Sequence, residues 1–178
     1  KFPGEFQKGV DYVGNTEALK RSLCTHAAIC SGIGGYRLSL HSGSDKFSIY
    51  PLFDEVTDGQ FHIKTSGTSW LQAVQLIAQT DPTLFTELYR FCLLHLEESK
   101  QAYQVSLSAG QLPPMPPSDL GDFLARPSVR QLFHISYGVL LEEAGREIRS
   151  LLHAHEQEHY RLVAEHIERH LQALQSVR

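Results

Sequence analysis

The sequence predicts an α/β protein in which short parallel strands alternate with helices. Two runs show the two-residue period of a strand, because Leu38 and Leu40 alternate with polar residues and Phe61 and Ile63 do the same. Each run ends in small polar residues and is followed by a helical pattern. This order of strand, turn and helix is typical of α/β folds with parallel pairing.

The N-terminal third is predicted to contain one helix before the first of these strands. Residues 1–14 are rich in glycine and form an irregular segment, with one short strand at about 10–13. Asn15 has the short polar side chain of a helix N-cap. The helix that follows is expected to end at the glycines at 32, 34 and 35, and its apolar face comprises Leu19, Leu23, Ala27 and Cys30.

The middle of the chain is predicted to be mainly helical. Asp58 and Gly59 are expected to reverse the chain before the second strand, and Thr68 or Ser69 to cap the helix after it. Asp81-Pro82 ends this helix and opens another, at about 83–101. Residues 105–107 are predicted to form a third short strand.

The last third begins with a proline-rich break. Four of the residues in 110–117 are prolines, which lack a backbone donor, so the segment is a loop over the site or a boundary between subdomains. A helix is predicted from Ser128, and one or two long amphipathic helices from about 143. We predict one domain with three segments: a strand-helix segment that carries the site (1–110), a proline-rich loop (111–127) and a helical segment (128–178).

Composition excludes several classes of partner. The 178 residues carry 16 basic and 20 acidic side chains, a formal charge of -4, and no basic tract suited to nucleic acid. No apolar run approaches the roughly 20 residues that span a bilayer. The three cysteines are odd in number and widely spaced, which indicates free thiols in a reducing cytoplasm. The first residue is Lys1 rather than Met, so we interpret the chain as a piece of something longer.

The polar residues at the strand ends form the candidate site. Functional groups in α/β folds gather where parallel strands end, and both runs end in hydroxyl-bearing and glycine residues that suit an anionic, polyhydroxylated small molecule. The long histidine-rich C-terminal helix is the other candidate. We interpret its histidines as packing residues or as part of a subunit contact, because a zinc site would need a third ligand and a defined pocket.

The two strand-turn runs resemble the tagaturonate/fructuronate epimerase family of bacterial hexuronate metabolism. The runs are 38–51 (Leu-Ser-Leu-His-Ser-Gly-Ser-Asp-Lys-Phe-Ser-Ile-Tyr-Pro) and 61–71 (Phe-His-Ile-Lys-Thr-Ser-Gly-Thr-Ser-Trp-Leu). Phe-His-Ile-Ser-Tyr-Gly at 133–138 and the segment near the start add to the likeness. The resemblance implies a metal-dependent isomerase on a TIM-barrel-like (β/α) fold. Family members are considerably longer, so this chain is expected to be their C-terminal portion.

The candidate roles follow from this chemistry. The expected metal ligands of a divalent ion, with Zn, Mn and Ni as candidates, are His41 and His62. The expected catalytic residues are Asp45 and Lys64, with Asp45 either taking a substrate proton or holding the metal. The expected substrate-binding residues are Ser42, Ser44, Lys46, Thr65 and Thr68. Helix capping, turn formation and core packing are alternative roles for most of these residues.

The resemblance implies a six-carbon keto acid as substrate. The carbon that is inverted in it lies one position beyond the carbons next to the ketone, so removal of a proton beside the carbonyl does not invert that carbon. Metal-assisted carbon-carbon cleavage and reclosure is the favoured route, because transient oxidation needs a nicotinamide and the sequence has no Gly-x-Gly-x-x-Gly unit. We therefore predict a cytoplasmic epimerase that acts on a small sugar acid. The C-terminal helix is the candidate contact between subunits of a homo-oligomer. The alternative is a non-catalytic sugar-acid-binding or subunit-contact fragment.

Overall fold

The chain divides into two compact units in the computed structural model, which describes residues 2–42, 45–65, 68–103, 105–113 and 119–175. Unit 1 comprises residues 1–7, 11–66 and 167–178, and unit 2 comprises 8–10 and 67–166. The change from one unit to the next at 66/67 lies inside the segment 1–110, and the proline-rich stretch lies inside unit 2.

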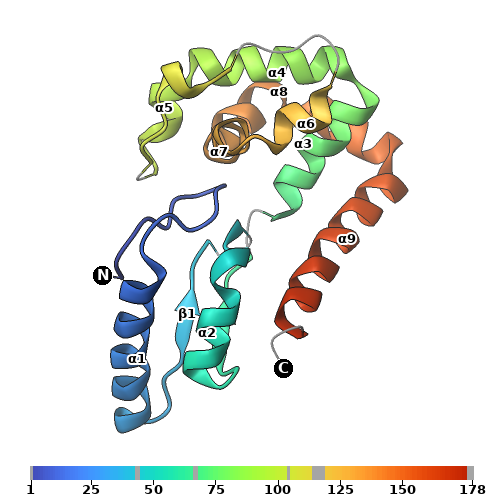
Figure 1. Cartoon of the computed structure of the whole chain (residues 1–178). Coiled ribbons are helices and arrows are strands. Elements are labelled where there is room, and N and C mark those ends of the chain that lie inside the picture. Colours follow the sequence, from blue (N-terminus) through green and yellow to red (C-terminus); the bar gives the residue numbers. More distant parts are fainter. Residues whose placement is uncertain (1, 43–44, 66–67, 104, 114–118, 176–178) are drawn as a thin grey trace. The chain divides into compact units, whose positions relative to one another are not determined.

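Unit 1 is built around one pair of parallel strands. In chain order its elements are α1 (Thr16–Ile33), β1 (Leu38–Leu40), the 3-10 helix η2 (Phe47–Ile49), α2 (Tyr50–Thr57) and β2 (Phe61–Ile63). The register pairs Leu38 with Phe61, Ser39 with His62 and Leu40 with Ile63. Helices α1 and α2 lie on either side of β1 in Figure 1 and contact each other. The predicted parallel pairing is therefore confirmed.

The ends of α1 are determined by local residues. Asn15 has an extended backbone, and its side-chain oxygen accepts a 2.8 Å hydrogen bond from the amide of Ala18. This satisfies one of the amides that the first turn leaves without a helical partner. At the other end Gly34 has a φ of +77°, which glycine adopts without steric cost, and its amide bonds to the carbonyl of Cys30. Both predicted ends of this helix are confirmed.

The core of unit 1 lies on the apolar side of the two strands. It contains the buried residues Leu19, Leu23, Leu40, Ile49, Tyr50 and Phe53. Leu38, Phe61 and Ile63 pack against this cluster, whereas Ser39 and His62 between them are exposed. The two-residue alternation in the sequence thus corresponds to one buried face and one polar face of the sheet.

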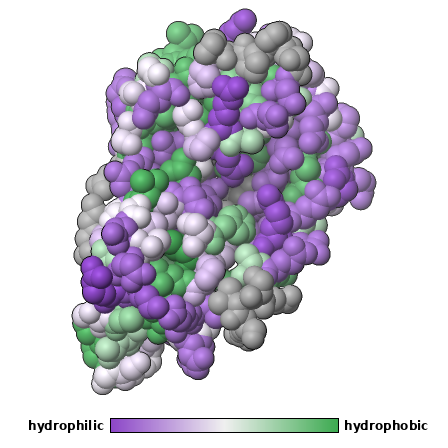
Figure 2. Space-filling view, viewed as in Figure 1, coloured by the Kyte–Doolittle hydropathy of each residue, from purple (hydrophilic) through white to green (hydrophobic). Residues whose placement is uncertain are grey.

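Every secondary-structure element among the described residues of unit 2 is a helix. Its elements are α3 (Thr68–Thr80), α4 (Pro82–Leu94), α5 (Leu96–Lys100), η3 (Ala109–Gln111), α6 (Leu120–Ala125), α7 (Pro127–Ile135) and α8 (Tyr137–Ala154). The last helix, α9 (Glu156–Gln175), belongs to unit 2 as far as His166 and to unit 1 from Ile167. In the space-filling view, hydrophilic residues predominate where α9 reaches the visible surface (Figure 2).

The core of unit 2 is large and includes hydrogen-bonded aromatic residues. Phe85, Phe123 and Phe133 are fully buried. The indole N–H of the buried Trp70 donates a 2.8 Å hydrogen bond to the carbonyl of Phe133, so this polar group is satisfied. Gly9, with a φ of +75°, lies so close to α7 that a Cβ atom there would be 2.9 Å from the Cα of Gln131.

The expected TIM-barrel-like fold is wrong for this chain. The described residues contain one two-stranded sheet, β1-β2, and most of the rest is helical. The third strand predicted at 105–107 is absent from the described structure. Val105 and Leu107 do point inward and pack on the core of unit 2, but no strand lies beside them. The strand predicted at 10–13 is reduced to a single bridge between Glu5 and Val13.

The helix predicted at about 83–101 is two shorter helices, whereas the amphipathic C-terminal stretch forms two helices, which is one of the two alternatives predicted for it. The stretch 83–101 is divided at His95, whose φ of -102° and ψ of 20° depart from helical values, into α4 and α5. Similar breaks at Ser136 and His155 separate α7, α8 and α9. Within the described parts of the chain, no helix is both long and apolar enough to cross a membrane.

Candidate functional site

The exposed face of the β1-β2 pair carries most of the strand residues that were predicted to act. We call this the polar sheet face, and by strand alternation it comprises Arg37, Ser39, His41, Gln60, His62 and Lys64. All six are exposed. The ladder continues past β1, because the amide of Lys64 donates a 2.9 Å hydrogen bond to the carbonyl of Leu40. The structure therefore places both predicted metal ligands and the predicted catalytic lysine on one face.

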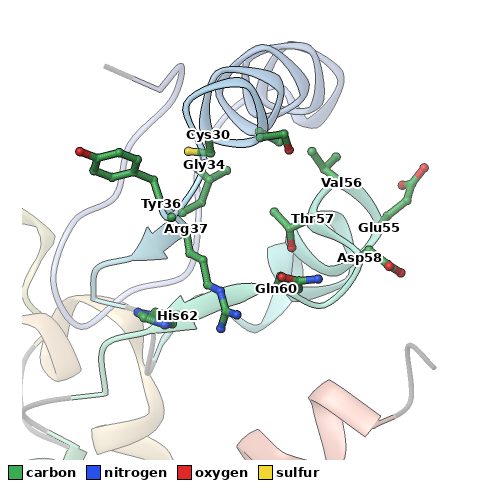
Figure 3. A pocket seen from close by; sticks show the side chains of 14 residues that line it. Cys30, Gly34, Tyr36, Arg37, Glu55, Val56, Thr57, Asp58, Gln60 and His62 are labelled. Atoms are coloured by element: carbon green, nitrogen blue, oxygen red, sulfur yellow. The ribbon is translucent and has the colours of Figure 1, made fainter.

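A cavity of about 840 Å³ opens beside the start of this face. Its walls come from the C-terminal ends of α1 and α2 and from the residues that lead into the two strands. His62 lines it, together with Arg37, Gln60 and Thr57. In Figure 3 the guanidinium of Arg37 extends between the side chains of His62 and Gln60. The cavity thus brings one predicted site residue, His62, together with polar residues that were not predicted.

His41 and His62 suit a shared metal ion only in part. His62 is level with Ser39, two residues before His41, so strand geometry places their Cα atoms roughly 8 Å apart on one face. Two imidazoles at that spacing can approach one ion. Among the residues that the structure describes, however, no group of three or more His, Cys, Asp or Glu side chains is arranged to hold a metal. These two histidines are therefore candidate metal ligands, but they do not by themselves form a complete coordination set.

Asp45 and Lys46 lie in the interior of unit 1. Asp45 is 8% exposed and Lys46 is fully buried. The ammonium of Lys46 donates a 2.8 Å hydrogen bond to the backbone carbonyl of Gln7. Burial, followed by the negative charges of Asp45 and Asp11, raises the pKa of the Tyr50 hydroxyl well above its usual value. The Asp45 carboxylate therefore acts on Tyr50 electrostatically.

Two of the predicted hydroxyl-bearing residues, Ser42 and Thr65, have described side chains. Ser42 is half-buried and has a φ of +57°, which is uncommon for residues other than glycine. Thr65 follows β2 and is half-buried. Thr68 is the first residue of α3 in unit 2, and its side chain is outside the described part of the structure, as is Ser44.

A second cavity of about 440 Å³ in unit 1 contains Thr65. Its other walls come from α2, β2 and the end of α9, and include His170, Leu171 and Ile167. His170 is buried, and its ring centroid is 4.7 Å from that of Phe47. This packing agrees with the interpretation of His170 as a core residue. Ile167 and Leu171 are partly exposed, and a subunit contact through this helix stays a prediction.

Arg37 and Gln60 are two polar residues of the cavity that sequence reasoning missed. Both stand one residue before a predicted strand, and the alternation that identified His41 and His62 extends to them. The sequence pattern therefore indicated the face of the sheet on which these two side chains lie. The sequence pattern did not predict the cavity, because the cavity depends on where α1 and α2 end.

A family model described as tagaturonate epimerase matches residues 1–174 of the chain. The chain belongs to the tagaturonate epimerase family. It is 42% identical, over 180 residues, to a tagaturonate/fructuronate epimerase of Thermotoga maritima. That alignment covers 98% of this chain and 37% of the relative.

Solved structures of the tagaturonate epimerase family share the fold of this chain. The native crystal structure of fructuronate-tagaturonate epimerase from Cohnella laeviribosi is 38% identical and matches with a TM-score of 0.89. A complex of that protein described as containing two glycerols matches with a TM-score of 0.90. Each match covers 97% of this chain and 37% of the other, so the chain spans little more than a third of the length of these relatives.

Proposed function

We propose that this chain is part of an epimerase that interconverts D-tagaturonate and D-fructuronate in the cytoplasm. The observation that carries the proposal is the 42% identity to a tagaturonate/fructuronate epimerase across 98% of the chain. The exposed polar sheet face supports it, because imidazole, guanidinium and ammonium groups suit an anionic sugar.

Carbon-carbon cleavage and reclosure accounts for inversion at a carbon remote from the ketone. A base takes the proton of the hydroxyl on the carbon to be inverted, and that carbon becomes an aldehyde as its bond to the neighbouring carbon breaks. The electron pair of this bond passes to the carbon beside the ketone, as an enediolate. The aldehyde half then rotates, the bond forms again on the opposite face, and the proton returns to the oxygen.

We assign candidate roles in this reaction to the site residues that the sequence predicted. Lys64 and Asp45 are the proposed proton-transfer groups, and His41 and His62 the proposed ligands of a divalent cation. When bound, such a cation supplies Lewis acidity at the ketone oxygen. Ser42, Ser44, Lys46, Thr65 and Thr68 remain the candidate substrate-binding residues.

Conversion of D-tagaturonate to D-fructuronate, followed by NMR, tests the proposal in a polypeptide of the relatives' length that contains this chain. Chelation with EDTA is expected to abolish turnover, and addition of Mn²⁺, Ni²⁺ or Zn²⁺ to restore it. His41→Ala and His62→Ala are each expected to lower kcat by about 100-fold or more and to weaken metal binding in calorimetry. His153→Ala, an exposed histidine on α8, is the matched control.

Two outcomes contradict parts of the proposal. Turnover that persists after complete removal of divalent ions would exclude the metal route. Absence of any interconversion of the two acids, in a protein that is folded by circular dichroism, would exclude the epimerase function itself.

A further inference from the structure

The cavity beside the polar sheet face contains polar groups with no protein partner. The side chains of Arg37, Gln60 and His62 line it. None of these three side chains makes a hydrogen bond or ion pair with any residue that the structure describes. The five N–H donors of the Arg37 guanidinium and the side-chain amide of Gln60 are therefore available to a ligand.

The three groups are arranged along the strand direction. Because Leu38 pairs with Phe61, Arg37 and Gln60 stand at the same level, one residue earlier. His62 stands two residues further on, which is roughly 7 Å along the strands. A six-carbon acid is long enough to reach from the level of Arg37 to that of His62.

The acidic residues of the cavity do not neutralise Arg37. Glu55 forms a 2.6 Å ion pair with Lys20, so its charge is already balanced. Asp58, at the left-handed end of α2, is exposed, and in Figure 3 its carboxylate points away from Arg37. The positive charge of Arg37 is thus left to face the cavity.

The two lysines among the predicted site residues are less suited to bind a carboxylate. The ammonium of Lys46 is buried and bonds to the carbonyl of Gln7. Lys64 is exposed on the polar sheet face but presents a single compact charge on a flexible stem. A guanidinium offers two parallel N–H donors, which match the two oxygens of a carboxylate.

We propose that Arg37 binds the carboxylate of the sugar acid in this cavity, with Gln60 beside it hydrogen-bonded to a substrate hydroxyl. The inference rests on the proposed function for the identity of the substrate. It makes Arg37 the residue that distinguishes a sugar acid from the corresponding neutral ketose.

Calorimetric titration of the full chain with D-tagaturonate and with D-tagatose tests this inference without requiring turnover. Arg37→Gln is expected to weaken D-tagaturonate binding by about 10- to 100-fold, because a hydrogen-bonded charge is lost, and to leave D-tagatose binding unchanged. Arg37→Lys should restore part of the affinity, since it returns the charge without the planar fork. Arg21→Gln, an exposed arginine of α1 that does not line the cavity, is the matched control.

Three results would overturn the inference: no binding of D-tagaturonate by the unchanged chain, equal losses for both sugars in Arg37→Gln, or a selective loss in Lys64→Gln but not in Arg37→Gln. Failure of the proposed function gives a different pattern. Arg37-dependent binding without interconversion in the longer polypeptide would support the carboxylate site and exclude the epimerase.

Discussion

The ammonium of Lys46 lies 2.8 Å from the backbone carbonyl oxygen of Gln7, 39 residues away along the chain, and the Lys46 side chain is fully buried. This bond ties the N-terminal segment of unit 1 to the region after β1. A buried charge is retained only where its donors are satisfied, so the pair is expected to matter for stability.

Lys46→Met is predicted to lower the free energy of unfolding by about 1–3 kcal/mol, because the carbonyl of Gln7 loses its charged donor. Lys64→Met, at an exposed position, is expected to change it by no more than about 0.5 kcal/mol. Urea denaturation followed by circular dichroism measures both. Equal effects of the two substitutions would show that the buried bond contributes nothing.

Capping by Asn15 gives a second prediction. Asn15→Ala removes the acceptor for the amide of Ala18 and is expected to cost about 1 kcal/mol of stability. Asn15→Asp keeps an acceptor and adds a charge that the helix dipole favours, so its stability should equal or exceed that of the original chain. A loss of similar size in both variants would contradict the capping role.

Two glycines are predicted to respond in opposite ways to alanine. Gly9→Ala puts a Cβ atom 2.9 Å from the Cα of Gln131 at a φ of +75°, and is expected to cost about 1–3 kcal/mol. Gly32→Ala, inside α1 with nothing within 4 Å of the new atom, should stabilise by about 0.5–1 kcal/mol. Thermal unfolding of both variants tests the contrast, and stabilisation by Gly9→Ala would refute the close approach.

Stability is predicted to fall in alkaline solution. Burial raises the pKa of the Cys92 thiol to about 12, and burial also raises the pKa of the Tyr89 hydroxyl. Below about pH 8 both groups are protonated in the folded and the unfolded chain, so the folded state keeps its full advantage. Above that pH the unfolded chain releases protons that the folded chain holds, and the free energy of unfolding decreases until the folded Cys92 thiol also ionises near pH 12.

Urea denaturation between pH 8 and pH 11 measures this loss, and Cys92→Ala should reduce its steepness. Thiol labelling at pH 8 gives an independent check. The exposed Cys24 should react first, and the buried Cys92 only after denaturation. Rapid labelling of Cys92 in the native chain would contradict its burial.

The sequence predicted what depends on neighbouring residues. Four predicted features have a local cause and are all present: the N-cap at Asn15, the helix boundary at Asp81-Pro82, the reversal at Asp58-Gly59 and the two short strands. The same alternation at 105–107 did not produce a strand. Val105 and Leu107 bury their side chains against helices, and alternation alone does not supply a neighbouring strand.

The arrangement of the candidate site depended on partners that are distant in sequence. Strand alternation placed His41, His62 and Lys64 on one face, as expected. The direction of the Lys46 side chain was set by Gln7, and the cavity around Arg37 by the points at which α1 and α2 end. The barrel was expected from the family likeness, and the strands of this chain do not provide it.

The position of Trp70 determines how the two units can be observed. It is the single tryptophan of the chain and lies in the core of unit 2, so intrinsic fluorescence excited at long wavelength reports the unfolding of that unit alone. Tryptophan fluorescence does not report the unfolding of unit 1. An environment-sensitive dye attached to the exposed Cys24 would report it. Recording both signals in one denaturation experiment would show whether the two cores lose their structure together.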